Sequence, residues 1–172
     1  KVQALREEMG LNRPLPQRYG QWVTYFLKGD MGTSYYYQEP VSKMIGDKIP
    51  ITIAMTVIAF VFILLLTVPV SLLSVRYENR FIDRFFLIFN QITMSIPPFF
   101  IGIIFTVLFG LTFHFFTPGD YISYTESMSG FIGYLILPSL AIALPKAAMT
   151  IKMFRNSLIT EMHQDYVRTA FS

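Results

Sequence analysis

Three long apolar stretches dominate the pattern of hydrophobic and polar positions along the 172-residue chain. The first, residues 51–75, holds 25 residues without a charged side chain. As a helix it would be roughly 37 Å long at about 1.5 Å per residue, whereas a bilayer core of about 30 Å needs roughly 20 residues. The pattern therefore predicts a membrane-spanning helix over residues 51–75 and not a buried helix of a soluble protein.

The second apolar stretch, residues 85–116, is too long for one straight crossing. Its 32 residues carry no acidic or basic side chain apart from His114, and as a helix they would extend about 48 Å. Pro97 and Pro98 lie inside it, and two consecutive prolines remove two backbone donors and clash with the preceding turn. We predict one span with a kink or break at this pair, because each half is short for crossing alone.

The third apolar stretch, residues 131–151, contains Pro138, Pro145 and a single charge, Lys146. A helix entered from Phe131 places Lys146 about 22 Å along its axis, where a lysine can reach the far headgroups by snorkelling. Together the three stretches predict an all-α membrane protein, a polytopic helical bundle with its transmembrane domain over residues 50–172.

The preceding segment, residues 1–49, is amphipathic. One helix is predicted to open at Pro16 and stop at Gly29, with its apolar face formed by Tyr19, Trp22, Val23, Phe26 and Leu27. A second short helix is predicted from near Pro40 to Pro50, where proline should end it. Aromatic-rich amphipathic helices beside a membrane lie along the interface or pack on neighbouring spans.

The distribution of basic residues predicts the orientation. Residues 76–84 hold three arginines, residues 117–130 hold no Lys or Arg, and the tail holds Lys152, Arg155 and Arg168. Basic residues favour the cytoplasmic side in short loops, so residues 76–84 and the tail are predicted to be cytoplasmic. Residues 1–49 are then extracellular despite seven Lys and Arg, because long segments translocate largely regardless of charge.

Composition narrows the possible functions. Only 15% of the residues are charged, 53% are hydrophobic and 16% are aromatic, which excludes disordered chains, collagens and nucleic-acid-binding tails. The absence of Cys excludes thiolate metal sites, and His114 and His163 lie on opposite sides in the predicted topology. Residues 29–34 lack the Lys of a phosphate-binding loop. We therefore expect no catalytic activity, no cofactor and no nucleic-acid partner.

Polar side chains inside the second span are the first candidate site. They precede the proline pair and, with it, comprise Asn90, Gln91, Thr93, Ser95, Pro97 and Pro98. Unpaired amides in lipid are unfavourable, so these groups must face a partner or a wet cavity. The residues either line a translocation path or join helices by hydrogen bonds, and the sequence leaves both open.

The tail, residues 153–172, is the second candidate site. It mixes apolar and charged positions at helical spacing, with Leu158, Met162, Tyr166 and Thr169 able to share one face. Such a helix suits docking into a groove of another protein, and on periodicity alone it could equally face lipid. The residues that we expect to carry docking are Glu161, Asp165, Tyr166, Arg168, Thr169 and Ala170.

Several short motifs resemble the inner-membrane permease subunits of ABC importers for oligopeptides, dipeptides and nickel. In chain order they are residues 11–19 (LNRPLPQRY), 29–34 (GDMGTS), 95–99 (SIPPF), 137–141 (LPSLA) and 165–170 (DYVRTA). Each motif alone is weak, but five in order around three spans form a specific pattern.

The resemblance implies a subunit of a bacterial inner or plasma membrane that imports short peptides or nickel and metal chelates by alternating access. Its implied partners are a second homologous permease subunit, two ATPase subunits that hydrolyse ATP, an extracellular substrate-binding protein and the membrane lipid. It also implies that the chain is a fragment holding the second, third and fourth of six spans.

The last motif resembles the start of the cytoplasmic coupling loop of these permeases, expected over residues 156–172. Arg168 and Thr169 stand where the general pattern has Glu and Ala, and Ala170 matches the second Ala.

Two other classes of membrane protein remain as alternatives. A secondary transporter usually carries an intramembrane acid, which the three apolar stretches lack; the other class is a structural membrane protein without a path.

Overall fold

The computed structural model describes residues 3, 6 and 10–170, and the described elements are helical apart from one isolated β-bridge. The prediction of an all-α fold is thus confirmed for this part of the chain. The chain divides into two compact units, Lys1–Ile51 and Thr52–Ser172.

The first unit contains α2 (Leu15–Leu27) and the loop that follows it. Pro16 lies in the first turn of α2, where its missing N–H is not needed. Tyr19, Trp22 and Phe26 follow one another along one face, with ring centroids 6.2 and 5.5 Å apart. The helix ends before Gly29, whose φ of 86° suits glycine best. The bounds of α2 agree with the helix predicted between Pro16 and Gly29, and none of its side chains is buried.

Helix α3 (Val41–Arg76) begins where the second short helix was predicted, but the predicted stop at Pro50 is wrong. The helix continues through Pro50 for another 26 residues. A proline inside a helix costs about 3 kcal/mol, whereas ending the helix beside the apolar residues that follow would leave several backbone groups without partners. Continuing the helix is therefore the less costly outcome.

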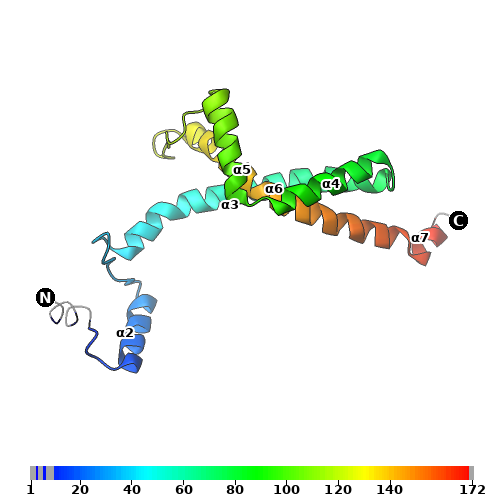
Figure 1. Cartoon of the computed structure of the whole chain (residues 1–172). Coiled ribbons are helices and arrows are strands. Elements are labelled where there is room, and N and C mark those ends of the chain that lie inside the picture. Colours follow the sequence, from blue (N-terminus) through cyan, green and yellow to red (C-terminus); the bar gives the residue numbers. More distant parts are fainter. Residues whose placement is uncertain (1–2, 4–5, 7–9, 171–172) are drawn as a thin grey trace. The chain divides into compact units, whose positions relative to one another are not determined.

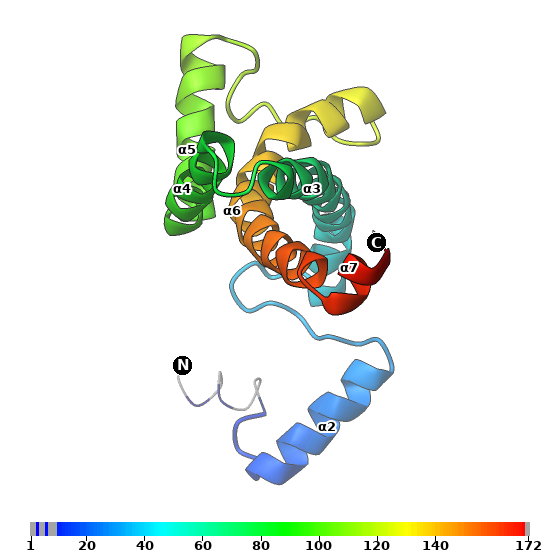
Figure 2. The same ribbon diagram turned by 90° about the vertical axis from the view of Figure 1, so that its right-hand side faces the viewer.

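In the second unit α6 (Met128–Met162) is the central helix. Among the described residues, seven of the nine buried apolar side chains belong to it: Phe131, Leu135, Ala141, Ala143, Ala147, Ala148 and Ile151. Helices α4 (Phe81–Ser95) and α5 (Pro98–Phe105) pack on α6. Figure 2 shows α6 between α4 and the part of α3 that follows Thr52, and the Ser71 hydroxyl donates to the Ile151 carbonyl of α6 at 3.4 Å.

Membrane crossing is supported by helix length and composition. Among the described residues, α3 and α6 are each long and apolar enough to span a bilayer, and the bent pair that begins with α4 would make a third span. Many large apolar side chains of these helices remain exposed, as expected of surfaces that face lipid or other helices.

The second apolar stretch differs in its bounds from the prediction of 85–116. Its helical part begins at Phe81, the first residue of α4. It ends at Thr112, since a π-helical segment, η1 (Thr106–Thr112), directly continues α5. After η1 the chain turns back at His114, which has a φ of 54°. This reversal stacks Phe115 on Phe109, with centroids 6.1 Å apart.

The tail does not form the single helix on which Leu158, Met162, Tyr166 and Thr169 were expected to share a face. Helix α6 runs to Met162, and a separate short helix, α7 (Asp165–Ala170), follows (Figure 1). The His163 ring nitrogen Nδ1 lies 2.7 Å from the Ile159 carbonyl oxygen, which also accepts from the His163 backbone N–H at 3.2 Å. Leu158 and Met162 therefore belong to a different helix from Tyr166 and Thr169. Residues 171 and 172 lie outside the described residues.

Candidate functional site

The break in the second span lies at the predicted proline pair. Helix α4 ends at Ser95, Ile96 and Pro97 adopt extended backbone conformations, and Pro98 opens α5. The two helical parts, Phe81–Ser95 and Pro98–Thr112, meet at an angle of 99°. An apolar segment of this length is therefore sharply bent, either as one broken span or as a re-entrant loop (Figure 1).

The polar residues before the break lie on two different faces of α4. Asn90 and Thr93 are buried, with 4% and 7% of their surface exposed, whereas Gln91 and Ser95 are exposed. The hydroxyls of Thr93 and Ser95 donate to the carbonyls four residues earlier, at 2.8 and 2.9 Å. These hydroxyls are thus satisfied by their own helix and need no external partner.

The second unit has one cavity beside these residues and another beyond the break. Asn90 and Thr93 line a small one, of about 70 Å³, between α3, α4 and α6. A larger cavity, of about 730 Å³, lies beyond the break between α5, η1 and the first turns of α6. Phe99, Thr106, Tyr134 and Pro138 are among the residues that line it. The larger cavity is predominantly aromatic and apolar, and it begins directly after the proline pair.

The tail residues are largely exposed. Glu161 lies in the last turn of α6, and the Tyr166 hydroxyl of α7 donates a hydrogen bond to the Glu161 carboxylate. This hydrogen bond raises the pKa of Tyr166 above its ordinary value. Asp165 and Thr169 are exposed on α7, and the Thr169 hydroxyl donates to the Asp165 carbonyl at 2.9 Å. The side chains of Arg168 and Ala170 lie outside the described part of the structure.

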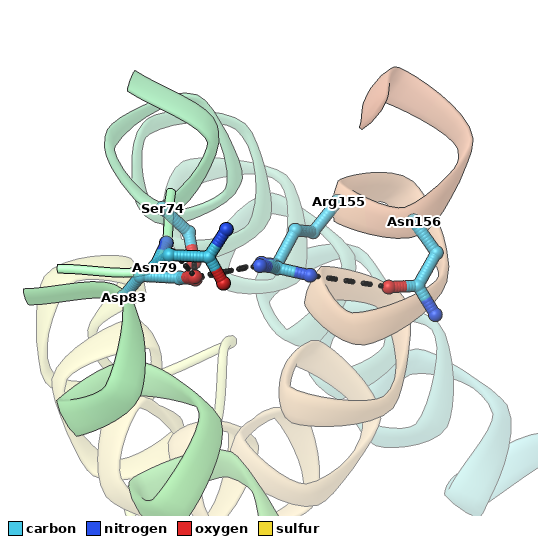
Figure 3. Close-up of polar contacts among 5 residues, drawn as sticks. All are labelled: Ser74, Asn79, Asp83, Arg155 and Asn156. Carbon is cyan, nitrogen blue, oxygen red and sulfur yellow. Dashed lines mark hydrogen bonds and ion pairs between the residues drawn. The ribbon is translucent and has the colours of Figure 1, made fainter. Parts of the chain in front are cut away.

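A buried polar cluster joins the ends of α3, α4 and α6, and the sequence analysis did not single it out. We call it the Asp83 cluster; it comprises Ser74, Asn79, Asp83 and Arg155 (Figure 3). The Asp83 side chain is 2% exposed and that of Arg155 is 11% exposed. Arg155 was counted only as a basic tail residue, and 72 residues separate it from Asp83.

Each carboxylate oxygen of Asp83 accepts two hydrogen bonds. Oδ1 accepts from the Ser74 hydroxyl at 2.5 Å and from Arg155 Nε at 2.7 Å. Oδ2 accepts from the Asn79 backbone N–H at 3.0 Å and from Arg155 Nη2 at 2.6 Å. Arg155 therefore binds Asp83 through two parallel bonds, the strongest geometry for this ion pair. The sequence did contain one signal for this cluster, since Asp83 is an acidic residue in the first turn of an otherwise apolar helix.

Within residues 3, 6 and 10–170, no three His, Cys, Asp or Glu side chains group closely enough to hold a metal ion.

Comparison with known proteins adds to this geometry. Residues 67–172 match the sequence profile of a family described as the binding-protein-dependent transport system inner membrane component. A Brucella abortus protein that carries the provisional name of a peptide transport system permease is 29% identical over 171 residues, which is 99% of this chain and 54% of that protein.

Two further relatives are similar over most of the chain. A probable peptide ABC transporter permease of Sinorhizobium fredii is 29% identical over 169 residues, 98% of this chain and 54% of that protein. The oligopeptide transport system permease AppB of Bacillus subtilis is 28% identical over 167 residues, 95% of this chain and 53% of that protein. The chain thus spans about half the length of the curated relatives that it matches.

Proposed function

Because the chain belongs to the family of inner membrane components of binding-protein-dependent transport systems, we propose that it is part of the permease of an ATP-driven importer. The motifs in the sequence indicated the same family. In this role the chain catalyses no reaction itself. It contributes helices to a path that opens alternately to the two sides of the membrane, and separate ATPase subunits supply the energy.

The substrate that we propose is a short peptide. The observation that carries this choice is the similarity over almost the whole chain to permeases whose names specify peptide or oligopeptide transport. A nickel or metal chelate, the other substrate implied by the motifs, has no comparable support. The proposed partners are a second homologous permease, two ATPases and an extracellular binding protein.

The proposed path follows the broken span. Gln91 and Ser95 lie on the exposed face of α4, and the cavity of about 730 Å³ begins after Pro98. Asn90 and Thr93, which are buried against α3 and α6, serve helix packing. In this proposal Gln91 and Ser95 thus line the path, whereas Asn90 and Thr93 hold helices together.

The alternative classes have less support. A secondary transporter needs an acidic group in the membrane that is available for ion coupling. Helix α4 does include Asp83 in its first turn, but Arg155, Ser74 and the Asn79 N–H occupy its carboxylate. A purely structural membrane protein would not need the bent helix or the cavity beyond it.

The test of this function is uptake of a radiolabelled tripeptide by cells that carry the complete transporter. Deleting the gene for this chain alone should abolish uptake, and restoring it should recover uptake. Uptake that is unchanged by the deletion would contradict the proposal.

The path is tested by cysteine substitution, for which the chain offers a clean background because it has no Cys. Gln91→Cys should react with a charged, water-soluble thiol reagent in the assembled transporter. Asn90→Cys is the matched control, one residue away and buried, and it should be protected. Equal protection of both positions would place Gln91 against lipid or protein instead of water.

A further inference from the structure

The Asp83 cluster lies at the junction of four segments of the chain. Ser74 belongs to the last turn of α3, Asn79 to the following turn, Asp83 to the first turn of α4 and Arg155 to the terminal part of α6. Asn79 has a φ of 61°, a left-handed conformation that asparagine tolerates better than most residues. This conformation belongs to the tight turn whose N–H is donated to the Asp83 carboxylate.

The carboxylate of Asp83 has no free acceptor position. An ionised carboxylate offers about four lone-pair sites, and the cluster fills them with one hydroxyl, one backbone N–H and two guanidinium N–H groups. The Asp83 carboxylate is therefore not left for binding a substrate or an ion, and Nη1 of Arg155 donates to the Asn156 side-chain oxygen at 3.4 Å (Figure 3). The cluster must act by holding its segments together.

Stability alone is a weak reason for such a pair. Replacing a buried ion pair by packed apolar side chains of similar volume is often neutral or stabilising, whereas removing one partner is strongly destabilising. The feature that apolar side chains cannot reproduce is orientation, because two parallel bonds to a planar guanidinium fix the direction as well as the distance.

The position of the cluster connects the two candidate sites. Arg155 is seven residues before the end of α6 at Met162, or about 10 Å along the axis, and α7 follows. Asp83 is twelve residues before the end of α4 at Ser95, or about 18 Å along that helix, where the break begins. The cluster is thus the polar link between the helix that leads to the tail and the helix that leads to the break.

We propose that the Asp83 cluster is a rigid coupling joint, which makes the α3–α4 turn and the terminal part of α6 move as one body. Movement imposed on the tail by closure of the ATPases would then reach the break at Ile96–Pro97 through α4. This inference rests on the proposed function, since it requires an ATPase partner at the tail. Asp83, Arg155 and Ser74 are positioning residues that touch no substrate.

The first test replaces the cluster by apolar side chains in the complete transporter. The triple variant Ser74→Ala/Asp83→Leu/Arg155→Met leaves no unpaired charge, and the remaining Asn79 N–H lies at an exposed residue that water reaches. It should insert and co-purify with its partners in normal amounts. Transport should fall about tenfold, the scale of a typical coupling between sites, and ATP hydrolysis should lose its stimulation by the substrate-loaded binding protein.

Ser71→Ala is the matched control. Ser71 is also a fully buried serine of α3, one turn before Ser74, and it donates to the Ile151 carbonyl of α6 instead of to Asp83. This variant should transport as the wild type does. A triple variant that is recovered normally and transports at the wild-type rate would overturn the coupling role.

The second test needs no change in the cluster. Spin labels at Phe81→Cys and Met153→Cys, both exposed, report the distance between the start of α4 and the end of α6. This distance should be the same in the nucleotide-free and ATP-trapped transporter, and a distance that changes between the two states would overturn the joint.

The two tests also separate the joint from the proposed function. If the function is wrong, the wild-type chain itself fails to support peptide uptake. If the joint is wrong, the wild type transports and either the triple variant does as well or the label distance changes. The distance measurement depends only on closure by ATP, so it decides the joint for any substrate.

Discussion

Replacing Gly110 by alanine should destabilise the protein, although alanine is the better helix former. Gly110 is buried in η1, beneath the loop that turns back after His114. A methyl group there would lie 2.8 Å from Pro118 Cγ and 3.2 Å from Phe116 Cζ. Carbon atoms pack best at about 3.5–4.0 Å, so the loop would have to move outward by roughly 0.7 Å.

The expected magnitude follows from two opposing effects. Overpacking of this kind typically costs about 1–3 kcal/mol, and replacing glycine by alanine inside a helix returns about 0.5–1 kcal/mol. Taken at the middle of each range, the net loss should be about 1 kcal/mol. Gly102→Ala is the matched control in the same bent segment, since its methyl group would lie 4.0 Å from Ala141 Cβ, an ordinary contact. Only the gain of about 0.5–1 kcal/mol remains there.

The two variants should therefore change the free energy of unfolding in opposite directions. The assay is denaturant titration of the purified protein in mild detergent micelles, followed by helix content. Because Gly110→Ala acts through Pro118, the variant Pro118→Ala should relieve the clash, and the double variant should be more stable than additivity predicts by about 1 kcal/mol. The reasoning fails if Gly110→Ala matches Gly102→Ala, or if the two substitutions at Gly110 and Pro118 are additive.

Three further predictions concern topology and the tail. A cysteine at Asp120 should react with a membrane-impermeant reagent in intact cells and one at Asn79 should not; the reverse pattern would invert the topology. Ala170→Glu should abolish transport and reduce co-purification of the ATPase while the chain still inserts, and normal transport with full recovery of the complex would argue against docking by α7. His163→Ala should remove the ring contact to the Ile159 carbonyl and destabilise the last turn of α6 by about 1 kcal/mol; amide hydrogen exchange in that turn should accelerate, and unchanged exchange would show that the ring does not stabilise the helix end.

The sequence predicted those features that depend on neighbouring residues. The apolar runs indicated the long helices, and Pro97 with Pro98 located the bend, because prolines act on the turn that contains them. Asn90 and Gln91, which the sequence groups as neighbours, differ in burial, since adjacent residues on a helix are about 100° apart and only positions three or four apart share a face.

Two other features depend on comparisons that a local pattern does not make. Pro50 was predicted to end a helix because a proline inside a helix is unfavourable. That prediction left out the larger free-energy cost of unpaired backbone groups in the apolar segment that follows. The pairing of Asp83 with Arg155 joins positions 72 residues apart, and neither residue lies in a motif that signals the other. Such a contact exists only once α4 has packed on α6.

The bend at Ile96–Pro97 also has an uneven balance of backbone donors and acceptors. A helix start normally leaves four N–H groups without a partner in the helix. Here Pro97 and Pro98 have no N–H, and the Phe100 N–H donates to the Pro97 carbonyl. Of the four positions, the N–H of Phe99 remains. The Thr93 carbonyl accepts from the Ile96 N–H, and the other last carbonyls of α4 have no N–H of their own helix to accept from, so the bend presents mainly acceptors. Carbonyls tolerate incomplete pairing better than buried N–H groups do, and the proline pair thus makes a sharp bend compatible with an apolar surrounding. Alanine in place of Pro97 would add a backbone donor at the bend, which would then need an acceptor or water.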